Sequence, residues 1–117
     1  MTRYDESKYQ EQVITVLQRY YRDVFFTAGF AGERLDGRAA MRRKRMGYRP
    51  GTPDIIVLEA RGGFHGLLIE MKSSTGRQTP EQKEFQSLSE ARGYCYRVCK
   101  STQEGMAAIT EYMALKK

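Results

Sequence analysis

Two strongly apolar runs separated by a glycine-rich turn constrain the fold of this chain more than any other feature. The runs are residues 55–58 (IIVL) and 67–69 (LLI), and the connection between them contains two adjacent glycines. Short runs of aliphatic residues favour strands, and glycine in a short connection favours a tight reversal of the chain. We therefore predict a β-hairpin with strands over 54–60 and 66–72, whose apolar side chains belong to the core.

The sequence on either side of this hairpin predicts further helices and strands. Apolar residues at helical spacing predict a helix over 5–22, and Thr79, Pro80 and Gln82 form a capping-box pattern that begins a helix ending near residue 92. The remaining predicted elements are a strand over 24–28, a short helix over 38–46, a strand over 94–99 and a helix over 101–115. The order α-β-(α)-β-β-α-β-α predicts an α/β fold with helices flanking a mixed sheet. A length of 117 residues predicts a single domain over 1–117.

The composition is that of an ordinary globular protein. Hydrophobic residues make up 40% and charged residues 29% of the chain, and no apolar run approaches the roughly 18 residues that cross a bilayer. The N-terminal stretch MTRYDESKYQ is too polar for a signal peptide. Cys95 and Cys99 are the only cysteines, and their spacing within one predicted strand is too wide for a disulfide. These features predict a cytoplasmic protein.

The net charge of +6 is concentrated in one segment. Residues 38–49 (RAAMRRKRMGYR) contain six of the 20 basic residues and no acidic residue, so the rest of the chain is electrically balanced. A local basic segment is typical of proteins that bind the phosphate backbone of nucleic acids, although a solvated, solubilising surface is the alternative. The candidates for nucleic-acid contacts are Arg42, Arg43, Lys44, Arg45, Arg49 and, in the loop STGRQ, Arg77.

Charged residues stand at the ends of both hairpin strands, where a protein core normally excludes them. Asp54 opens the first strand, and Glu70 and Lys72 close the second. Because antiparallel pairing brings the start of one strand beside the end of the other, the three side chains should lie close together. Alternation along the strand puts Glu70 and Lys72 on one face and the side chain of Met71 on the other.

This predicted cluster has the chemistry of a divalent-metal site. Two neighbouring carboxylates repel each other unless a cation lies between them, and oxygen ligands suit Mg²⁺ or Mn²⁺. The backbone carbonyl of Met71 is a further candidate ligand. A lysine beside the metal could orient or deprotonate the water that attacks a phosphodiester bond. We therefore predict a metal site formed by Asp54, Glu70 and Met71, with Lys72 next to it.

The Glu-x-Lys pattern is weak evidence by itself. The chain contains it three times, at residues 6–8, 70–72 and 81–83. Only the middle copy ends an apolar strand and follows a Pro-Asp pair that opens another strand. The competing interpretation is an exposed strand end with an incidental ion pair. The convergence of two acids and a lysine at one end of a buried hairpin favours the metal site.

In this combination the motifs resemble the PD-(D/E)xK nuclease signature, formed here by Pro53-Asp54 and Glu70-Met71-Lys72. More narrowly, the chain resembles the virus-type replication-repair nuclease (VRR-NUC) family, of the stand-alone phage or bacterial type. The matching stretches are ESKYQ at 6–10, GTPD at 51–54, GFHGLLIEMK at 63–72, TPEQ at 79–82 and GY at 93–94. The resemblance implies a restriction-endonuclease-like fold, metal-dependent hydrolysis of phosphodiester bonds, and a homodimer acting on branched DNA such as four-way (Holliday) junctions.

The resemblance also implies roles for residues at matching positions. These are the metal ligands Asp54 and Glu70, the catalytic lysine Lys72, the helix-borne acid Glu6, and the site-supporting amides Gln10 and Gln82. Gln10 follows Glu6 by one turn and lies on the same helical face. Two alternatives stay open: Glu11 could be the helix-borne acid in place of Glu6, and Gln82 could act only in the capping box.

The function predicted from these features is that of a metal-dependent, structure-selective DNA endonuclease. One alternative is a non-catalytic nucleic-acid-binding module, in which residues 38–49 bind and the charged cluster is a structural ion pair. Another is a sequence-specific restriction-type nuclease with the same chemistry. Metal-dependent turnover would distinguish the structure-selective endonuclease from the binding module. A panel of linear and branched substrates would distinguish it from the restriction-type nuclease.

Overall fold

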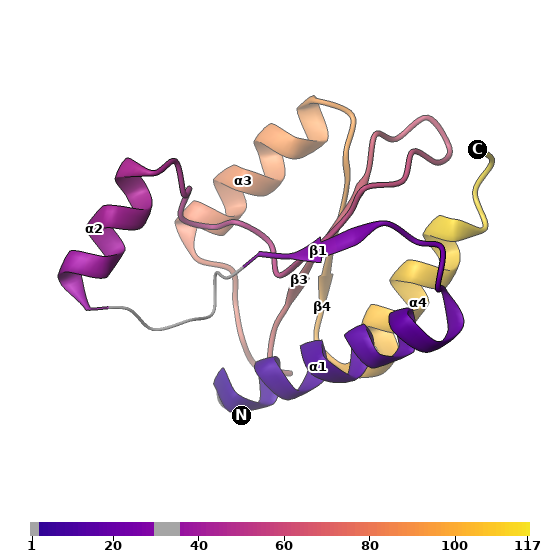
Figure 1. The fold of residues 1–117 in the computed structure, drawn as a ribbon, viewed down its shortest axis with the longest axis horizontal. Helices are drawn as coiled ribbons and strands as arrows, with labels where there is room; N and C mark the ends of the chain where they lie inside the picture. Colours follow the sequence, from indigo (N-terminus) through magenta and orange to yellow (C-terminus); the bar gives the residue numbers. More distant parts are fainter. Residues whose placement is uncertain (1–2, 30–35) are drawn as a thin grey trace.

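A four-stranded mixed sheet forms the centre of the protein, and helices cover both of its faces (Figure 1). The computed structural model describes residues 3–29 and 36–117. Its elements are α1 (Arg3–Tyr20), β1 (Phe26–Ala28), α2 (Gly37–Arg45), β2 (Ile55–Val57), β3 (Leu67–Met71), α3 (Pro80–Ala91), β4 (Cys95–Cys99) and α4 (Thr102–Met113). The predicted α/β class and the predicted order of elements are both confirmed.

The strands follow the order β1-β2-β3-β4 across the sheet. β1 pairs with β2 and β2 with β3 in antiparallel fashion, so the predicted hairpin is confirmed. β3 and β4 are parallel, and α3 connects them because parallel neighbours need a crossover between the end of one and the start of the next. The capping box predicted at the start of α3 is present, with Thr79 and Gln82 bonded to each other's backbone amides.

β1 and β2 are shorter than predicted because a side chain replaces a strand hydrogen bond beyond Phe26. The backbone N–H of Phe25 donates to the carboxylate of Glu59 over 2.9 Å, where a ladder partner would otherwise lie. Leu58 N still donates to Phe25 O over 2.8 Å, which is the last contact of this pair of strands. The regular pairing therefore ends at Val57, three residues before the predicted end at 60.

The core lies between the sheet and the pair α1 and α4, which cover the same face (Figure 1). It consists of Val13, Leu17, Ile55, Val57, Leu67, Ile69, Met71, Cys99, Ala108, Ile109 and Tyr112. Gly105 lets α4 approach α1 closely, because a Cβ atom there would lie 2.7 Å from Cγ2 of Val13. Val13 and Leu17 of α1 thus form one apolar layer with positions 55, 57, 67, 69 and 71 of the hairpin strands, whereas Tyr20 at the end of the predicted stripe is exposed.

β3 is buried along its whole length because helices lie on both of its faces. Leu67, Ile69 and Met71 belong to the core next to α1 and α4. The alternation of side chains therefore directs Leu68 and Glu70 to the opposite face, on the side of α3. A carboxylate is thereby held inside the protein, at the end of the central strand.

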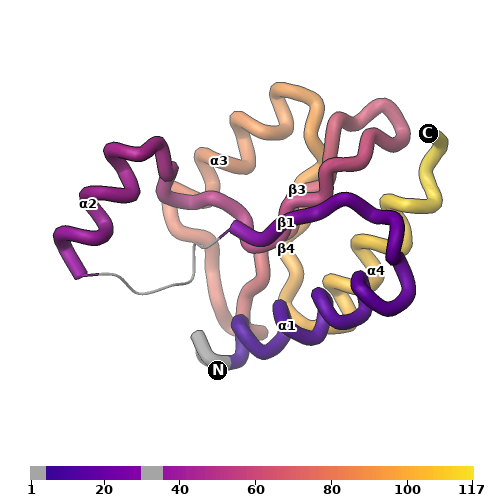
Figure 2. The backbone as a smooth tube through the Cα atoms, in the orientation of Figure 1, coloured from indigo at the N-terminus to yellow at the C-terminus, as the bar shows by residue number. Residues whose placement is uncertain are grey.

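α2 stands apart from the sheet in both views of the chain (Figures 1 and 2). None of its residues is buried, and Asp36 caps its N-terminus by accepting a hydrogen bond from the N–H of Ala39. The segment 46–54 leads from α2 back to the start of β2. Among the described residues, no helix combines the length and the apolar character that crossing a membrane requires.

Candidate functional site

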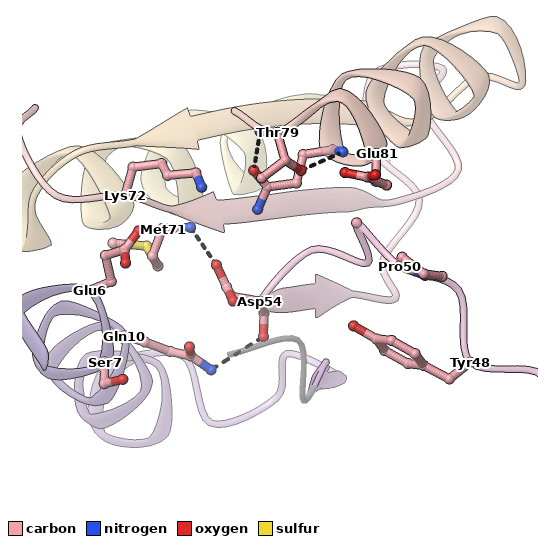
Figure 3. A pocket seen from close by; sticks show the side chains of 12 residues that line it. Glu6, Ser7, Gln10, Tyr48, Pro50, Asp54, Met71, Lys72, Thr79 and Glu81 are labelled. Atoms are coloured by element: carbon pink, nitrogen blue, oxygen red, sulfur yellow. Dashed lines mark hydrogen bonds between the residues drawn. The ribbon is translucent and has the colours of Figure 1, made fainter. Parts of the chain in front are cut away.

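Asp54 is held against the end of β3, as the hairpin geometry predicts. Its backbone N–H donates to Ile69 O over 2.9 Å, and its Oδ2 accepts a hydrogen bond of 2.6 Å from the N–H of Met71. From α1, Gln10 Nε2 donates to the carbonyl of Asp54 over 3.3 Å (Figure 3). The side chain of Met71 lies in the core, so its backbone faces the site, in agreement with the prediction.

Glu70 is 1% exposed, and its two carboxylate oxygens have different surroundings. Oε1 accepts hydrogen bonds from the hydroxyl of Tyr96 (2.7 Å) and from Nε2 of Gln78 (3.1 Å). Oε2 is buried and has no hydrogen-bond partner among the described residues. The nearest cation is Lys72 Nζ at 3.9 Å, which is an ion pair beyond hydrogen-bonding distance.

A pocket of about 330 Å³ opens beside this cluster, between α1, the segment 46–54, the end of β3 and the start of α3. It is lined by Glu6, Ser7, Gln10, Tyr48, Pro50, Gly51, Asp54, Met71, Lys72, Thr79, Glu81 and Gln82. Figure 3 shows Gln10 on α1 reaching Asp54 from below, Lys72 above that carboxylate, and Glu6 to its left, beside Met71. The structure therefore brings together residues from four separate parts of the chain.

The electrostatics of the pocket raise the pKa of Asp54 to about 6. Burial is the largest cause, and the negative charges of Glu70 and Glu6 act in the same direction. The hydrogen bond from Met71 and the charge of Lys72 oppose the shift. Negative charge therefore exceeds positive charge around Asp54, so a cation bound there would be stabilised.

The hydroxyl of Tyr96 remains a proton donor to Glu70. Burial raises the pKa of this phenol, and the hydrogen bond to the Glu70 carboxylate acts in the same direction. The phenol therefore stays protonated at neutral pH, which keeps one oxygen of Glu70 occupied.

The structure bears differently on the alternatives left open for α1 and for α3. Glu6 lines the pocket, whereas Glu11 is exposed and lines a neighbouring depression along α1 that shares only Ser7 and Gln10 with the pocket. For Gln82, both the capping-box role and a place at the site are compatible with the structure. Its Oε1 accepts a hydrogen bond of 2.9 Å from the N–H of Thr79, and its side chain also lines the pocket.

The donor set fits a magnesium-type ion. Within residues 3–29 and 36–117, no three His, Cys, Asp or Glu side chains converge into a ready-made metal cage. Mg²⁺ commonly uses only one or two protein carboxylates and completes its octahedron with water and substrate phosphate. Asp54, with its excess of surrounding negative charge, and Glu70, whose Oε2 has no partner among the described residues, are two carboxylates that could fill those positions.

The basic residues predicted to contact nucleic acid lie outside the pocket. Arg42, Lys44 and Arg45 are exposed on α2, and Arg77 is exposed in the loop between β3 and α3. Arg49 forms an exposed ion pair of 3.2 Å with Glu84 on α3. These side chains are thus available to a ligand that extends beyond the pocket.

The last turn of α2 nevertheless adjoins the pocket through one residue. Tyr48 lines the pocket, and its backbone N–H donates to Arg43 O over 2.9 Å. Tyr48 therefore connects α2 to the lining of the pocket.

Several residues at the site were not predicted from the sequence, among them Tyr48 in the pocket lining and the two hydrogen-bond partners of Glu70, Gln78 and Tyr96. The only available signal for Tyr96 was register, because it pairs with Leu68 in the parallel ladder and so lies on the same face as Glu70. That register depends on the crossover through α3 and is not encoded in a local pattern.

Comparison with known proteins identifies the family of this chain. The model of the VRR-NUC domain family matches residues 5–103. The chain belongs to the VRR-NUC family. Its fold is therefore of the nuclease type, and DNA is the substrate implied for a VRR-NUC domain.

Solved structures similar to this VRR-NUC chain include the following two, and no curated protein matches it. The first, described as a "VRR_NUC domain protein", is 29% identical and has a TM-score of 0.84. The alignment covers 97% of this chain and 91% of that protein. The second, a "VRR_NUC domain", has a TM-score of 0.59 over 92% of this chain and 97% of its own. At 19% identity this second likeness bears on the fold alone.

Proposed function

We propose that this VRR-NUC protein is a divalent-metal-dependent, structure-selective DNA endonuclease that acts as a homodimer on branched DNA such as four-way junctions. The observation that carries the proposal is that Asp54 and Lys72 line an open pocket, while Glu70 is buried next to Lys72 with one carboxylate oxygen that has no hydrogen-bond partner among the described residues. Two acids and a cation at the end of a buried hairpin are costly for the fold unless they bind a ligand.

In this proposal Asp54 and Glu70 hold Mg²⁺ or Mn²⁺, with the carbonyl of Met71 as a third protein ligand. When bound, the ion lowers the pKa of water and offsets negative charge on the phosphate being cleaved. Lys72, whose Nζ lies 3.9 Å from Oε2 of Glu70, would orient the attacking water by donating a hydrogen bond as the ammonium, or accept the proton of that water as the neutral amine. Glu6 adds negative charge near Asp54.

The two amides support the site in different ways. Gln10 ties α1 to the hairpin through the carbonyl of Asp54, which fixes the distance between Glu6 and Asp54. Gln82 links the capping box of α3 to the lining of the pocket. Loss of either amide is therefore expected to misplace the residues that react.

DNA is proposed to reach the pocket over α2. Replacing Arg42, Lys44 and Arg45 together by Gln should weaken binding to all DNA substrates, because each lost phosphate contact reduces the salt slope of log K by about 0.9. Binding titrations at several salt concentrations measure this slope. Lys100→Gln, on an exposed position near α4, is the control. A slope equal to that of the wild type would exclude α2 from the interface, and the same titration on Arg77→Ala tests the loop.

The homodimer follows from the symmetry of the substrate. One active site cuts one strand, whereas paired cuts across a four-way junction need two sites related by a two-fold axis. Sedimentation of the free protein and of its junction complex measures the number of chains. One chain in both states would contradict the junction-resolving part of the proposal.

A panel of DNA substrates tests the proposed selectivity. Linear duplex, flap, splayed and four-way junction DNA of shared sequence are incubated with Mg²⁺, and the cut positions are mapped. We expect paired cuts in the branched substrates and little cleavage of linear duplex. Cleavage of linear duplex at a fixed sequence would favour a restriction-type nuclease, and tight binding without cleavage would favour a non-catalytic module.

A further inference from the structure

A chain of hydrogen bonds behind the pocket ends on one oxygen of Glu70. Gln78 Nε2 donates to Glu70 Oε1 (3.1 Å) and also to Gln86 Oε1 (2.9 Å). Gln86 Nε2 in turn donates to Glu90 Oε2 over 3.2 Å. The amide of Gln78 is thereby oriented with its donor toward Glu70, because its other hydrogen is committed to Gln86.

The fold delivers the second donor from a different strand. Tyr96 lies opposite Leu68 in the parallel pairing of β3 with β4, so its side chain shares the α3-facing surface with Glu70. Its hydroxyl meets Oε1 of Glu70 over 2.7 Å. Tyr96 is itself nearly buried, at 6% exposure, so water does not readily replace this contact.

The result is an asymmetric carboxylate. Oε1 receives two hydrogen bonds from two different elements, and Oε2 receives none from the described residues. Rotation of the carboxylate would break both bonds to Oε1 inside the protein, where unmade hydrogen bonds are expensive. The lone pairs of Oε2 are therefore fixed in direction, on the side of Lys72.

We propose that Tyr96 and Gln78 are positioning residues that hold Oε1 of Glu70, so that Oε2 is the oxygen given to the divalent ion. The inference rests on the proposed function, since it concerns the same site. It goes beyond that function by naming two residues that touch neither the ion nor DNA and act through Glu70. Partners of this kind that orient a ligand typically change metal affinity by about 10–100-fold when removed.

The test is direct binding of Mn²⁺ to the whole chain without DNA, by isothermal titration calorimetry, with the electron paramagnetic resonance spectrum as a second readout. Tyr96→Phe removes only the hydroxyl, and Gln78→Met removes the amide at similar size. Both variants are expected to bind Mn²⁺ about 10–100-fold more weakly than the wild type. Tyr94→Phe is the matched control, because it makes the same change two residues away and should bind like the wild type.

Thermal unfolding separates positioning from a merely structural role. A structural role would lower the melting temperature of the variants and leave the affinity for Mn²⁺ unchanged. Wild-type affinity in folded Tyr96→Phe and Gln78→Met would overturn the inference and leave the proposed function intact. Absence of Mn²⁺ binding by the wild type would contradict the proposed function as well.

Discussion

Lys72→Ala is expected to slow DNA cleavage by about 10²–10⁴-fold at saturating protein, the range associated with loss of a positioned proton-transfer group. The ammonium of Lys72 lines the pocket and lies 3.9 Å from the unpaired oxygen of Glu70. Its removal leaves the two carboxylates in place, so metal binding should persist while the attacking water loses its partner. Single-turnover cleavage measures the rate of the chemical step separately from DNA binding.

The matched control for this variant is Lys83→Ala. Lys83 ends another Glu-x-Lys triplet, is exposed on α3, and does not line the pocket. Circular dichroism in the presence of Mg²⁺ checks that Lys72→Ala is folded, because the buried Glu70 loses its ion-pair partner. Cleavage by folded Lys72→Ala at the rate of Lys83→Ala would remove Lys72 from the mechanism.

Asp54→Asn is expected to stabilise the metal-free protein at neutral pH while abolishing cleavage. The pKa of Asp54 is raised to about 6 from an ordinary value of 3.8, mainly by burial. The folded state therefore binds this proton more tightly than the unfolded state, and stability falls as the pH rises from about 4 through 6. At pH 7 the ionised carboxylate costs about 2–3 kcal/mol.

Asparagine removes this cost, since it is neutral and keeps an oxygen that can accept the hydrogen bond from Met71. Thermal unfolding in EDTA should show a gain of about 2–3 kcal/mol for Asp54→Asn at pH 7.5 and little gain near pH 4. Mg²⁺ should stabilise the wild type and leave the variant unchanged. Asp23→Asn, at an exposed position, is the control. A variant less stable than the wild type at pH 7.5 in EDTA would show that ionised Asp54 does not destabilise the folded protein.

The central part of the site could be predicted because it depends on local rules. Period-two alternation and antiparallel pairing are enough to bring Asp54 beside Glu70 and Lys72, and the structure pairs Ile55 with Ile69 accordingly. The capping box at Thr79 was likewise a local pattern, and it is present. What these patterns could not supply is the shape of the pocket around the cluster.

The rest of the site depends on how distant elements cross. Glu6 reaches Asp54 only because α1 packs across the face of the sheet, so helical spacing alone did not separate Glu6 from Glu11. Tyr96 and Gln78 meet Glu70 through a parallel register and a loop conformation that follow from the packing of α3. The late start of β1 and the early end of β2 have a similar origin, because the carboxylate of Glu59 replaces a backbone hydrogen-bond partner there.

The most direct test of the central claim is cleavage of a synthetic four-way DNA junction by the wild type and by Lys72→Ala, with Mg²⁺, Mn²⁺ or EDTA. The account predicts paired cuts by the wild type with either metal, none in EDTA, and a rate lower by at least about 10²-fold for Lys72→Ala. Cleavage by the wild type in EDTA, or tight binding with no cleavage under either metal, would contradict it.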